Sequence, residues 1–238
     1  IPCYIPIYPR KPKNLYVPYI FSEEELKKIF KAADELMFVR RNFKCGIFSI
    51  PVLLRLLYST GMRIGEACSL INSDVDMSSR IILVRNTKNK RDRQLPISDS
   101  LYQVLEQYLI KRDKLPLHNM GNPNSPFLIS LDGSSLTGVS ARHWFYKILE
   151  ASDIDYIPKV GPRIHDLRHT FAVHVLDKLV KEGVDMHCCL PVLSMALGHK
   201  CVSDTEYYVR ITNQVYPHLS DTTSAISEYV FPTISTMK

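Results

Sequence analysis

Residues 80–97 read RIILVRNTKNKRDRQLPI, and this stretch decides the fold class of the chain. Residues 81–84 form an apolar run rich in β-branched side chains, and residues 95–97 form a second short apolar run. The polar and basic residues 86–93 separate the two runs. Two strand-forming runs that flank a polar turn predict an antiparallel β-hairpin.

Apolar residues recur at helical spacing on both sides of this hairpin. The first helix is expected to begin at Ser22, because Ser22 and Glu25 have the spacing of a capping box. Apolar periodicity predicts further helices, which cover residues 47–57, 64–70, 101–110, 141–149, 165–181, 186–197, 205–211 and 220–228. The sequence therefore predicts a mostly α-helical fold with a small antiparallel β-sheet, which is an α+β class.

The composition is that of an ordinary globular protein. Of the 238 residues, 45% are hydrophobic and 23% are charged, which excludes a collagen-like or wholly disordered chain. No apolar run approaches the roughly 18 residues of a membrane-spanning helix. The 30 Lys and Arg residues exceed the 24 Asp and Glu residues by a formal charge of +6, which permits a nucleic-acid partner without requiring one. Six cysteines show no C-x-x-C pair, which predicts free thiols in a reducing cytoplasm.

The two ends of the chain differ from the region between them. Residues 1–18 contain five prolines, which exclude a sustained helix and predict an extended segment. Three basic residues of this segment are candidates for contacts with a phosphate backbone: Arg10, Lys11 and Lys13. A solvated tether between domains is an equally compatible interpretation. Residues 229–238 begin with an apolar, β-prone Tyr-Val-Phe run, and the Ile at position 1 predicts a fragment of a longer protein.

Two basic motifs are candidates for binding an anion. Residues 60–67 read TGMRIGEA, and Arg63 lies between two glycines where a helix is expected to begin. Its guanidinium and the nearby backbone amides can meet an anion there. The hairpin turn gathers four basic residues, Lys88, Lys90, Arg91 and Arg93. A basic turn of this kind either reaches a phosphate or carries solvated charges, and its composition does not separate the two.

A third motif, His165-Asp166-Leu167-Arg168-His169, lies on an expected helix. His165 and His169 are four residues apart and share a helix face, as the zinc-binding histidines of H-E-x-x-H proteases do. Arg168 shares a face with His165 as well, and its cation suits an anionic ligand better than a metal ion. A zinc hydrolase therefore stays as an alternative to anion binding.

Two further motifs follow along the chain. Leu197-Gly198-His199 places a histidine directly after a glycine that is expected to end a helix. Tyr207-Tyr208 comes next, and Tyr208 is nine residues beyond His199. A single histidine or tyrosine is more often structural than functional. The presence of all five motifs in this order on one chain favours a functional role for them.

In this order, the five motifs resemble the catalytic domain of the tyrosine recombinases, the phage-integrase-like family of DNA strand-exchange enzymes. The family has an Arg in T-G-x-R-x-x-E, a Lys on a β-hairpin, H-x-x-R, then G-H or G-W, and a Tyr downstream. This chain reads T-G-M-R-I-G-E at 60–66, H-D-L-R-H at 165–169 and L-G-H at 197–199. The family's hairpin motif K-G-N-K-E-R-x-x-P aligns with residues 88–96, which assigns the catalytic Lys to Lys88, with Lys90 as the alternative. The resemblance covers residues 19 to 220.

The resemblance implies a catalytic set of six residues: Arg63, Lys88, His165, Arg168, His199 and Tyr208. In this family the Tyr attacks a phosphodiester and forms a 3′-phosphotyrosyl link, which leaves a free 5′-hydroxyl. The two arginines and His199 would stabilise the charge that develops on the non-bridging oxygens. His165 would act as general base and Lys88 as general acid. The same resemblance implies no metal, no ATP and no other cofactor, and it gives Glu66, Asp166 and His169 supporting roles.

The resemblance further implies that residues 19–228 form the catalytic domain. An interdomain linker at 1–18 would precede it, and a tail at 229–238 would pack on a neighbouring protomer. The expected partner is double-stranded DNA, bound by a homo-tetramer on paired sites with accessory DNA-bending or directionality proteins, in a bacterial cytoplasm and without a membrane. DNA contacts are expected from the basic residues of the hairpin and the linker, namely Lys90, Arg91, Arg93, Arg10, Lys11 and Lys13.

The function expected from the resemblance is site-specific DNA recombination, in which strand exchange through a Holliday junction integrates or excises a mobile element. A recombinase of the same chemistry that resolves chromosome dimers is the nearest alternative among enzymes. A DNA-binding module that does not cut is the alternative from a different class. The complete set of catalytic residues counts against that module.

Overall fold

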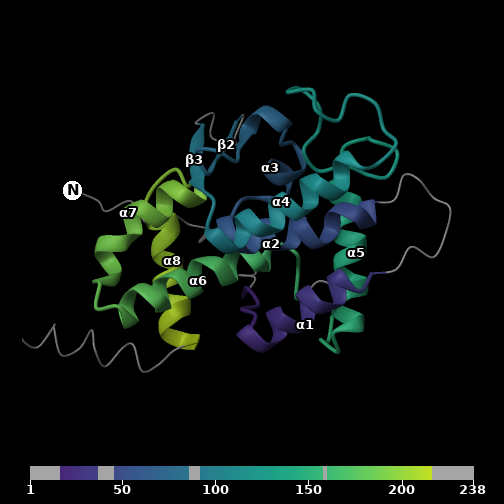
Figure 1. Cartoon of the computed structure of the whole chain (residues 1–238). Helices are drawn as coiled ribbons and strands as arrows, with labels where there is room; N and C mark the ends of the chain where they lie inside the picture. The colour runs from purple at the N-terminus through teal and green to yellow at the C-terminus, as the bar shows by residue number, and fades with distance from the viewer. Residues whose placement is uncertain (1–16, 37–45, 86–91, 158–159, 216–238) are drawn as a thin grey trace, which may run out of the picture.

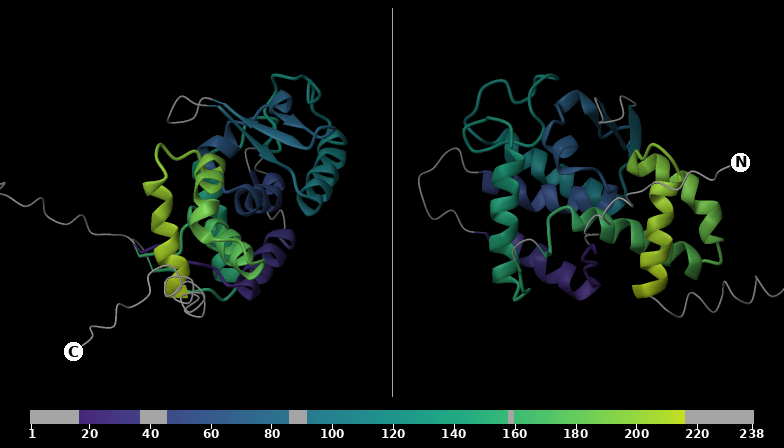
Figure 2. Two further views of the ribbon diagram at one scale, coloured as in Figure 1. Left: turned by 90° about the vertical axis from the view of Figure 1, so that its left-hand side faces the viewer. Right: turned by 180° about the vertical axis from the view of Figure 1, so that it is seen from behind.

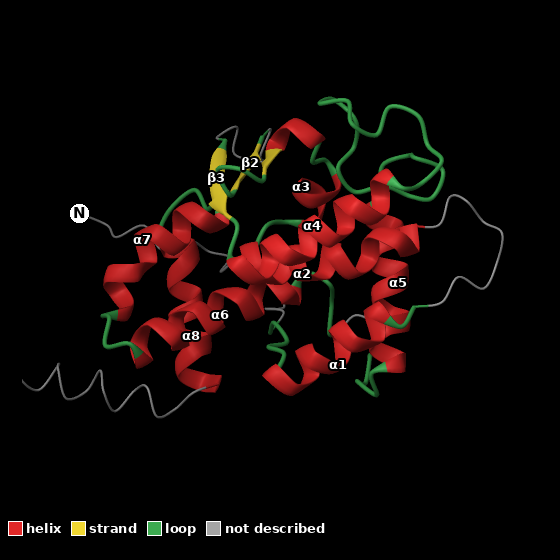
Figure 3. Ribbon diagram, in the orientation of Figure 1, coloured by secondary structure: helices red, strands yellow, loops and turns green. Residues whose placement is uncertain are grey.

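The computed structural model describes residues 17–36, 46–85, 92–157 and 160–215 (Figure 1). The elements along the chain are α1 (Glu23–Asp34), η1 (Gly46–Ser49), α2 (Ile50–Thr60), α3 (Ile64–Cys68), η2 (Asn72–Asp74), β1 (Val75–Asp76), β2 (Ile81–Val84), β3 (Arg93–Pro96), α4 (Asp99–Asp113), α5 (Gly138–Ala151), α6 (Asp166–Lys181), α7 (Met186–Leu197) and α8 (Ser203–Val215). Helices dominate, and the short strands lie together at one edge of the molecule (Figure 3). The predicted α+β class, mostly helical with a small antiparallel sheet, is confirmed. The predicted helix 220–228, the tail 229–238 and residues 1–16 of the predicted linker lie outside the described residues.

Helix α1 begins as its sequence predicts. The Ser22 side chain accepts a hydrogen bond from the backbone N–H of Glu25 at 3.2 Å, and the Glu25 carboxylate accepts one from the backbone N–H of Ser22 at 2.7 Å. This reciprocal capping box satisfies two backbone donors that the first helical turn leaves without intrahelical partners. Leu26, Ile29 and Ala33 then bury one face of the helix.

The predicted hairpin is present and belongs to a three-stranded antiparallel sheet with the order β1-β2-β3. Ile82 lies opposite Leu95, and both side chains are buried, so alternate residues of the two strands face the core. The sequence does not predict β1, because a strand of 2 residues is too short to show an alternating pattern. Residues 86–91, which join β2 to β3, lie outside the described residues.

The buried apolar side chains form two clusters, and helix α6 contributes to both. The first cluster, which includes Leu53 and Phe145, packs α1, α2, α4 and α5 against the sheet. The second is built by α6, α7 and α8 and includes Val173 and Leu193. Leu167, near the start of α6, belongs to the first cluster, so one helix joins the two. Figure 1 shows α6 running from the central helices to α7 and α8, and the turned views of Figure 2 show the same grouping.

Several helix boundaries differ from those predicted, for local reasons. The predicted helix 47–57 divides into η1 and α2, and Pro51 stands in the first turn of α2, where a backbone N–H is not needed. Helix α6 begins at Asp166 rather than at His165, which takes the N-cap position. Helix α8 continues beyond the predicted end at 211, because Thr212 is buried and its hydroxyl donates a hydrogen bond to the backbone carbonyl of Tyr208 at 2.7 Å.

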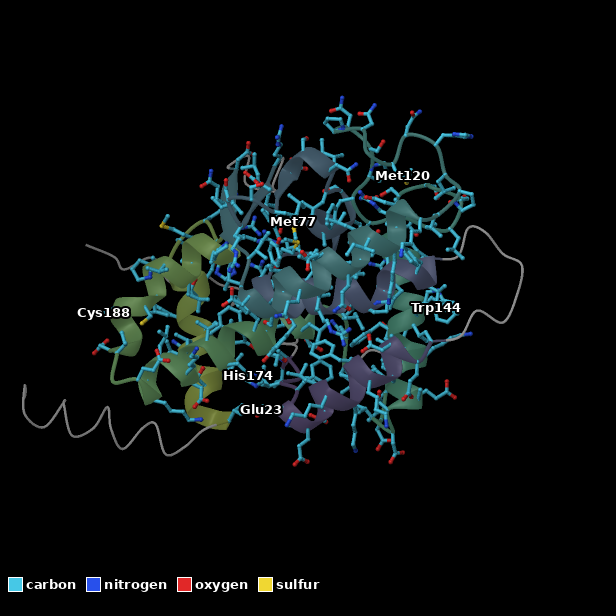
Figure 4. The ribbon with its side chains drawn as sticks, viewed as in Figure 1. Glu23, Met77, Met120, Trp144, His174 and Cys188 are labelled. Atoms are coloured by element: carbon cyan, nitrogen blue, oxygen red, sulfur yellow. The ribbon has the colours of Figure 1, made fainter. Side chains whose placement is uncertain are left out.

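Helix α7 carries apolar side chains on two faces. Leu190 and Leu193 pack into the second cluster, whereas Cys188, Val192 and Met195 are exposed. Figure 4 places Cys188 on the outer side of this helix. Exposed apolar side chains that gather on one helix face are a feature of interaction surfaces. Over the described ranges, no helix has both the length and the apolar character needed to cross a membrane.

The junction between α2 and α3 depends on Gly61, and we expect Gly61→Ala to destabilise the protein by about 2–3 kcal/mol. Gly61 has a φ of +63°, and a Cβ there would lie 2.4 Å from a ring carbon of Phe171 and 2.9 Å from a methyl carbon of Leu197. Urea unfolding at equilibrium measures the effect.

The matched control is Gly65→Ala in α3. A Cβ at Gly65 would have no described atom within 4 Å, and a helical Gly→Ala change stabilises by about 0.5–1 kcal/mol. Equal effects of the two substitutions would contradict the steric account of Gly61.

Candidate active site

Five residues of the predicted catalytic set lie in the described part of the chain, and they come from separate elements. Arg63 directly precedes α3, His165 and Arg168 lie at the start of α6, His199 follows α7, and Tyr208 belongs to α8. The basic residues Lys88, Lys90 and Arg91 of the hairpin, and Arg10, Lys11 and Lys13 of the linker, lie outside the described residues. The site forms where α6 meets the ends of α2 and α7 and the inner face of α8.

Arg168 fixes two of these helix ends. Its guanidinium donates one hydrogen bond to the carbonyl of Gly61 and another to the carbonyl of Leu197, each at 2.7 Å. The residue is only 3% exposed, so these charge-assisted bonds compensate for taking a cation out of water. Because Arg63 follows Gly61 and His199 follows Leu197, Arg168 sets the positions of both.

Arg63 is held at the mouth of the site by Glu66. The backbone N–H of Arg63 donates to one carboxylate oxygen of Glu66 at 2.8 Å, and its guanidinium donates to the other at 3.0 Å. A weaker bond of 3.4 Å joins the guanidinium to the carbonyl of Gly198. The Arg63 side chain is 27% exposed, which leaves a guanidinium of fixed orientation accessible to an anion.

The Arg93 side chain turns inward and pairs with Glu66. The sequence places Arg93 among the DNA contacts, but its side chain is 9% exposed and donates to both carboxylate oxygens of Glu66, at 3.1 and 2.7 Å. Its Nε also donates to the carbonyl of Ala196 at 2.8 Å. The strand explains the difference, because Arg93 is two residues from the buried Leu95 and therefore faces the same side of the sheet. Arg93 ties β3 to the end of α7, and its guanidinium is paired with Glu66.

We expect Arg93→Met to destabilise the protein by about 3 kcal/mol at neutral pH, and less in acid. Burial by itself would raise the pKa of Glu66, but hydrogen bonds from Arg93 and Arg63 outweigh it and lower this pKa from 4.5 to about 2. A carboxylate with a lowered folded-state pKa stabilises above pH 4.5, and this contribution is lost as the pH falls towards 2. The difference from the unmodified protein should therefore shrink between these pH values, as measured by urea unfolding.

Lys31→Met is the control for this substitution. Lys31 pairs with Glu35 at 3.9 Å, with side chains that are 77% and 67% exposed, and such pairs contribute less than about 1 kcal/mol. A pH-independent loss in Arg93→Met, or a loss no larger than that of Lys31→Met, would contradict the role assigned to the Arg93–Glu66 pair.

His199 is oriented by the start of α8. Its Nδ1 lies 2.8 Å from the hydroxyl oxygen of Thr205, a fully buried residue, and its ring stacks on that of Tyr208 with centroids 6.1 Å apart. Burial and the charges of Arg168, Arg63 and Arg93, opposed by Asp204, lower the pKa of His199 to about 4. The imidazole is therefore neutral near pH 7, and its remaining nitrogen can serve as a hydrogen-bond donor to an anion.

His165 and His169 lie next to each other on α6. Their rings are nearly perpendicular, with centroids 5.0 Å apart. His165 is exposed, so water screens part of the effect of its surroundings; desolvation and the charges of Arg168 and Arg63 lower its pKa. The part of the chain that the structure describes contains no group of three or more His, Cys, Asp or Glu side chains arranged to hold a metal ion.

Tyr208, and not Tyr207, is the tyrosine at the centre of this arrangement. Tyr208 is 2% exposed, and its hydroxyl lies 3.0 Å from Nδ1 of His169. Burial raises the pKa of Tyr208, while the positive charges of Arg168 and Arg63 act in the opposite direction. Tyr207 is partly exposed and lies beside the Tyr208 ring, in the rim of the second apolar cluster.

The contacts of two residues at this site were not foreseen in the sequence. His169 is expected only to support the site, yet it bonds the Tyr208 hydroxyl. Thr205 has no place in any motif, yet it bonds His199. The four-residue spacing from His165 is a signal for His169, because it places both rings on one helix face. Thr205 offers no comparable signal, since its contact depends on how the loop after α7 turns.

Comparison with known sequences gives one family match and many relatives. Residues 20–214 match the sequence model of the phage integrase family. Protein y4rB of Sinorhizobium fredii is 31% identical over 205 residues, which cover 85% of this chain and 64% of y4rB. Tyrosine recombinase XerA of Pyrococcus horikoshii is 30% identical over 208 residues, which cover 87% of this chain and 61% of XerA. The chain thus spans 61 to 64% of the length of these two curated relatives.

Comparison with solved structures gives neighbours of the same fold. The crystal structure of XerA recombinase has a TM-score of 0.61 at 24% identity and covers 87% of this chain and 66% of its own. XerH recombinase bound to a palindromic difH substrate, in a post-cleavage complex, has a TM-score of 0.63 at 23% identity over 89% of this chain and 54% of its own. The catalytic domain of bacteriophage HP1 integrase has a TM-score of 0.53 at 23% identity and covers 92% of this chain and 98% of its own. At these identities the likeness is one of fold.

Proposed function

Because the chain belongs to the phage integrase family, the tyrosine recombinases, we propose that it is a site-specific DNA recombinase that cleaves and rejoins duplex DNA through a 3′-phosphotyrosine intermediate. The observation that carries this proposal is the convergence of the buried Tyr208 with the guanidiniums of Arg63 and Arg168, whose charges act on its hydroxyl. These three residues come from three separate parts of the fold.

The charges of the site suit attack on a phosphodiester. Negative charge grows on the non-bridging oxygens as the nucleophile approaches phosphorus, and fixed cations stabilise it without reorganising. Arg63 supplies an accessible guanidinium and His199 a further donor, while Arg168 holds both in place and adds its charge. Because the arginines supply the positive charge, the proposed chemistry uses no metal. Because the phosphotyrosine conserves the bond energy of the phosphodiester, it uses no ATP.

The remaining predicted roles belong to the same proposal. Tyr208 attacks phosphorus, and Lys88, on the hairpin turn, protonates the 5′-oxygen that departs. Lys90 is the alternative for that acid. His165 lies close enough to the charges of Arg63 and Arg168 to meet the same phosphate.

Duplex DNA is the proposed partner. The formal charge of +6 supports it, as do the structural neighbours solved with DNA, such as XerH on its difH substrate and the Tn1549 integrase on a circular intermediate. The basic hairpin residues Lys90 and Arg91 and the linker residues Arg10, Lys11 and Lys13 are the proposed backbone contacts.

We further propose that four copies act on two DNA sites and that residues 229–238 pack on a neighbouring copy. The exposed apolar side chains Cys188, Val192 and Met195 of α7 offer a surface that suits such an apolar tail.

Integration or excision of a mobile element is the proposed biological role, with accessory proteins setting the direction. Resolution of chromosome dimers by the same chemistry is the second candidate, supported by the relatives named XerA and XerC.

The test is formation of a denaturant-resistant protein–DNA adduct. The protein is incubated in EDTA with nicked duplexes that carry a broad set of candidate ends and is then run on a denaturing gel. We expect a labelled adduct when the label lies on the strand that keeps its 3′-phosphate, and none when it lies on the released 5′-hydroxyl strand. Binding without any adduct would favour a non-catalytic DNA-binding module, and an adduct that required a metal would contradict the proposed chemistry.

A further inference from the structure

The Tyr208 hydroxyl contacts a histidine other than the one expected to serve as its base. Nδ1 of His169 lies 3.0 Å from the hydroxyl oxygen of Tyr208, and the two ring centroids are 5.6 Å apart. His165, the predicted base, is the N-cap residue of α6, four positions before His169, and is exposed to solvent. The structure therefore separates the two histidines, one against the buried hydroxyl and one at the open side of the site.

The protonation states of this pair allow Tyr208 to donate the hydrogen bond to His169. Burial raises the pKa of Tyr208, so the phenol keeps its proton at neutral pH. Burial, together with the neighbouring groups His165, Arg168 and His199, lowers the pKa of His169 to about 3, so its imidazole is neutral. A buried O–H needs an acceptor, and the lone pair of a neutral Nδ1 provides one. The proton of His169 then lies on Nε2.

The backbone around His169 is anchored through its two neighbours. Its neighbour Arg168 is anchored to the carbonyls of Gly61 and Leu197, and its other neighbour, Thr170, is fully buried and accepts a hydrogen bond from the backbone N–H of Phe21 at 3.0 Å. The backbone on each side of His169 is therefore anchored, and it presents the imidazole to the Tyr208 hydroxyl. Such fixed geometry is what proton transfer at a reacting atom requires.

We propose that His169 is a further catalytic residue, the base that takes the proton of Tyr208 during strand cleavage and returns it during rejoining; this rests on the recombinase function proposed above. In cleavage, the Tyr208 oxygen forms a bond to phosphorus, the bond from phosphorus to the 5′-oxygen breaks, and the phenol proton moves to Nδ1 of His169. The departing 5′-oxygen takes a proton from the general acid. In rejoining, the 5′-hydroxyl gives its proton back to the group that acted as general acid and its oxygen bonds to phosphorus. The bond from phosphorus to the Tyr208 oxygen then breaks, and that oxygen recovers its proton from His169.

The substrate itself increases the basicity of His169. A bound phosphodiester adds a negative charge beside Arg63 and Arg168, which offsets part of the positive charge that weakens the imidazole in the unbound protein. The phenol also becomes more acidic as its oxygen bonds to phosphorus. His165, at the open side, is left to donate a hydrogen bond to the phosphate.

The first experiment uses the nicked duplex on which the unmodified protein forms an adduct. It compares the rate of adduct formation by the unmodified protein with the rates of two variants. His169→Asn keeps an acceptor near the position of Nδ1 but has no base, so we expect it to slow the reaction by about 10²–10³-fold. His118→Asn, an exposed histidine remote from the site, should react at the unmodified rate. A normal rate in His169→Asn would overturn the proposal.

The second experiment separates proton transfer from positioning. Replacing Tyr208 by a fluorinated tyrosine makes the phenol more acidic, so the rate of cleavage depends less on a base that accepts its proton. If His169 takes the proton, the loss caused by His169→Asn should shrink by about 10-fold or more in the fluorinated protein. A loss of unchanged size would mean that His169 only positions the ring, which overturns the proposal.

A third measurement requires neither DNA nor a variant. Long-range ¹H–¹⁵N NMR of the unbound protein reports which ring nitrogen of His169 carries the proton. We expect the proton on Nε2, and a proton on Nδ1 would overturn the proposal.

If no duplex forms an adduct with the unmodified protein, the recombinase function itself fails. An adduct formed at a normal rate in His169→Asn refutes only the role of His169.

Discussion

Tyr208→Phe is expected to abolish the covalent protein–DNA adduct, with a loss of at least about 10⁴-fold, while leaving the protein folded. The substitution removes only the hydroxyl, and the ring keeps its contacts with His199 and the second apolar cluster. The cost in stability should be about 1 kcal/mol, the value of one hydrogen bond to His169. Gel analysis of the adduct and urea unfolding measure the two effects.

The neighbouring tyrosine provides the matched control. Tyr207→Phe makes the same chemical change one residue away, and we expect it to form the adduct at the unmodified rate. DNA binding, measured by mobility shift, should be retained in both variants. An adduct that persists in Tyr208→Phe and disappears in Tyr207→Phe would transfer the nucleophile to Tyr207.

Arg168→Lys should reduce the rate of adduct formation by about 10²–10³-fold and the stability by about 2–3 kcal/mol. A guanidinium reaches the carbonyls of Gly61 and Leu197 at the same time, whereas an ammonium is a point charge that lacks this planar fork. With lysine, the carbonyl at the end of either α2 or α7 is left without its hydrogen-bond donor. The positions of Arg63 and His199, which follow these two ends, become less well defined.

Arg112→Lys separates the loss of stability from the loss of activity. Arg112 is also buried, and its guanidinium donates to the side chain of Asn72 at 2.7 Å and to the carbonyl of Phe127 at 3.3 Å, away from the site. We expect a comparable loss of stability with an unchanged rate at a temperature where both variants are folded. Equal losses of rate would mean that Arg168 acts only through stability.

The local elements of this fold can be predicted from the sequence because short-range physics determines them. The capping box at Ser22 and the hairpin pairing of β2 with β3 follow from residues within a few positions of each other. Strand β1 could not be predicted, because it exists only through pairing with β2. The N-terminal boundary of α6 shifted by one residue because His165 takes the N-cap position, which propensity alone does not determine.

For the site, the motifs identified the residues but not all of their contacts. The order of the motifs along the chain was enough to predict that Arg63, Arg168 and Tyr208 belong to one site. It could not show that Arg93 turns inward to Glu66, although the spacing of Arg93 from Leu95 contained that information. Nor could it choose between two histidines one helical turn apart, because that choice depends on the angle at which α8 crosses α6. Contacts between distant segments are set by packing, which no local pattern encodes.

The position of Tyr208 in the last described helix has a consequence for the synthesis of the protein. The ribosome synthesises α2, α6 and α7 before α8. The residues proposed to bind the phosphate are therefore made before Tyr208, which is proposed to attack it. A chain interrupted before α8 lacks the nucleophile, and it also leaves Val173 and Leu193 without the helix that covers them. Such a product exposes apolar surface, as the substrates of quality-control proteases do. Under the proposed function, a chain that ends before α8 cannot form the covalent adduct with DNA.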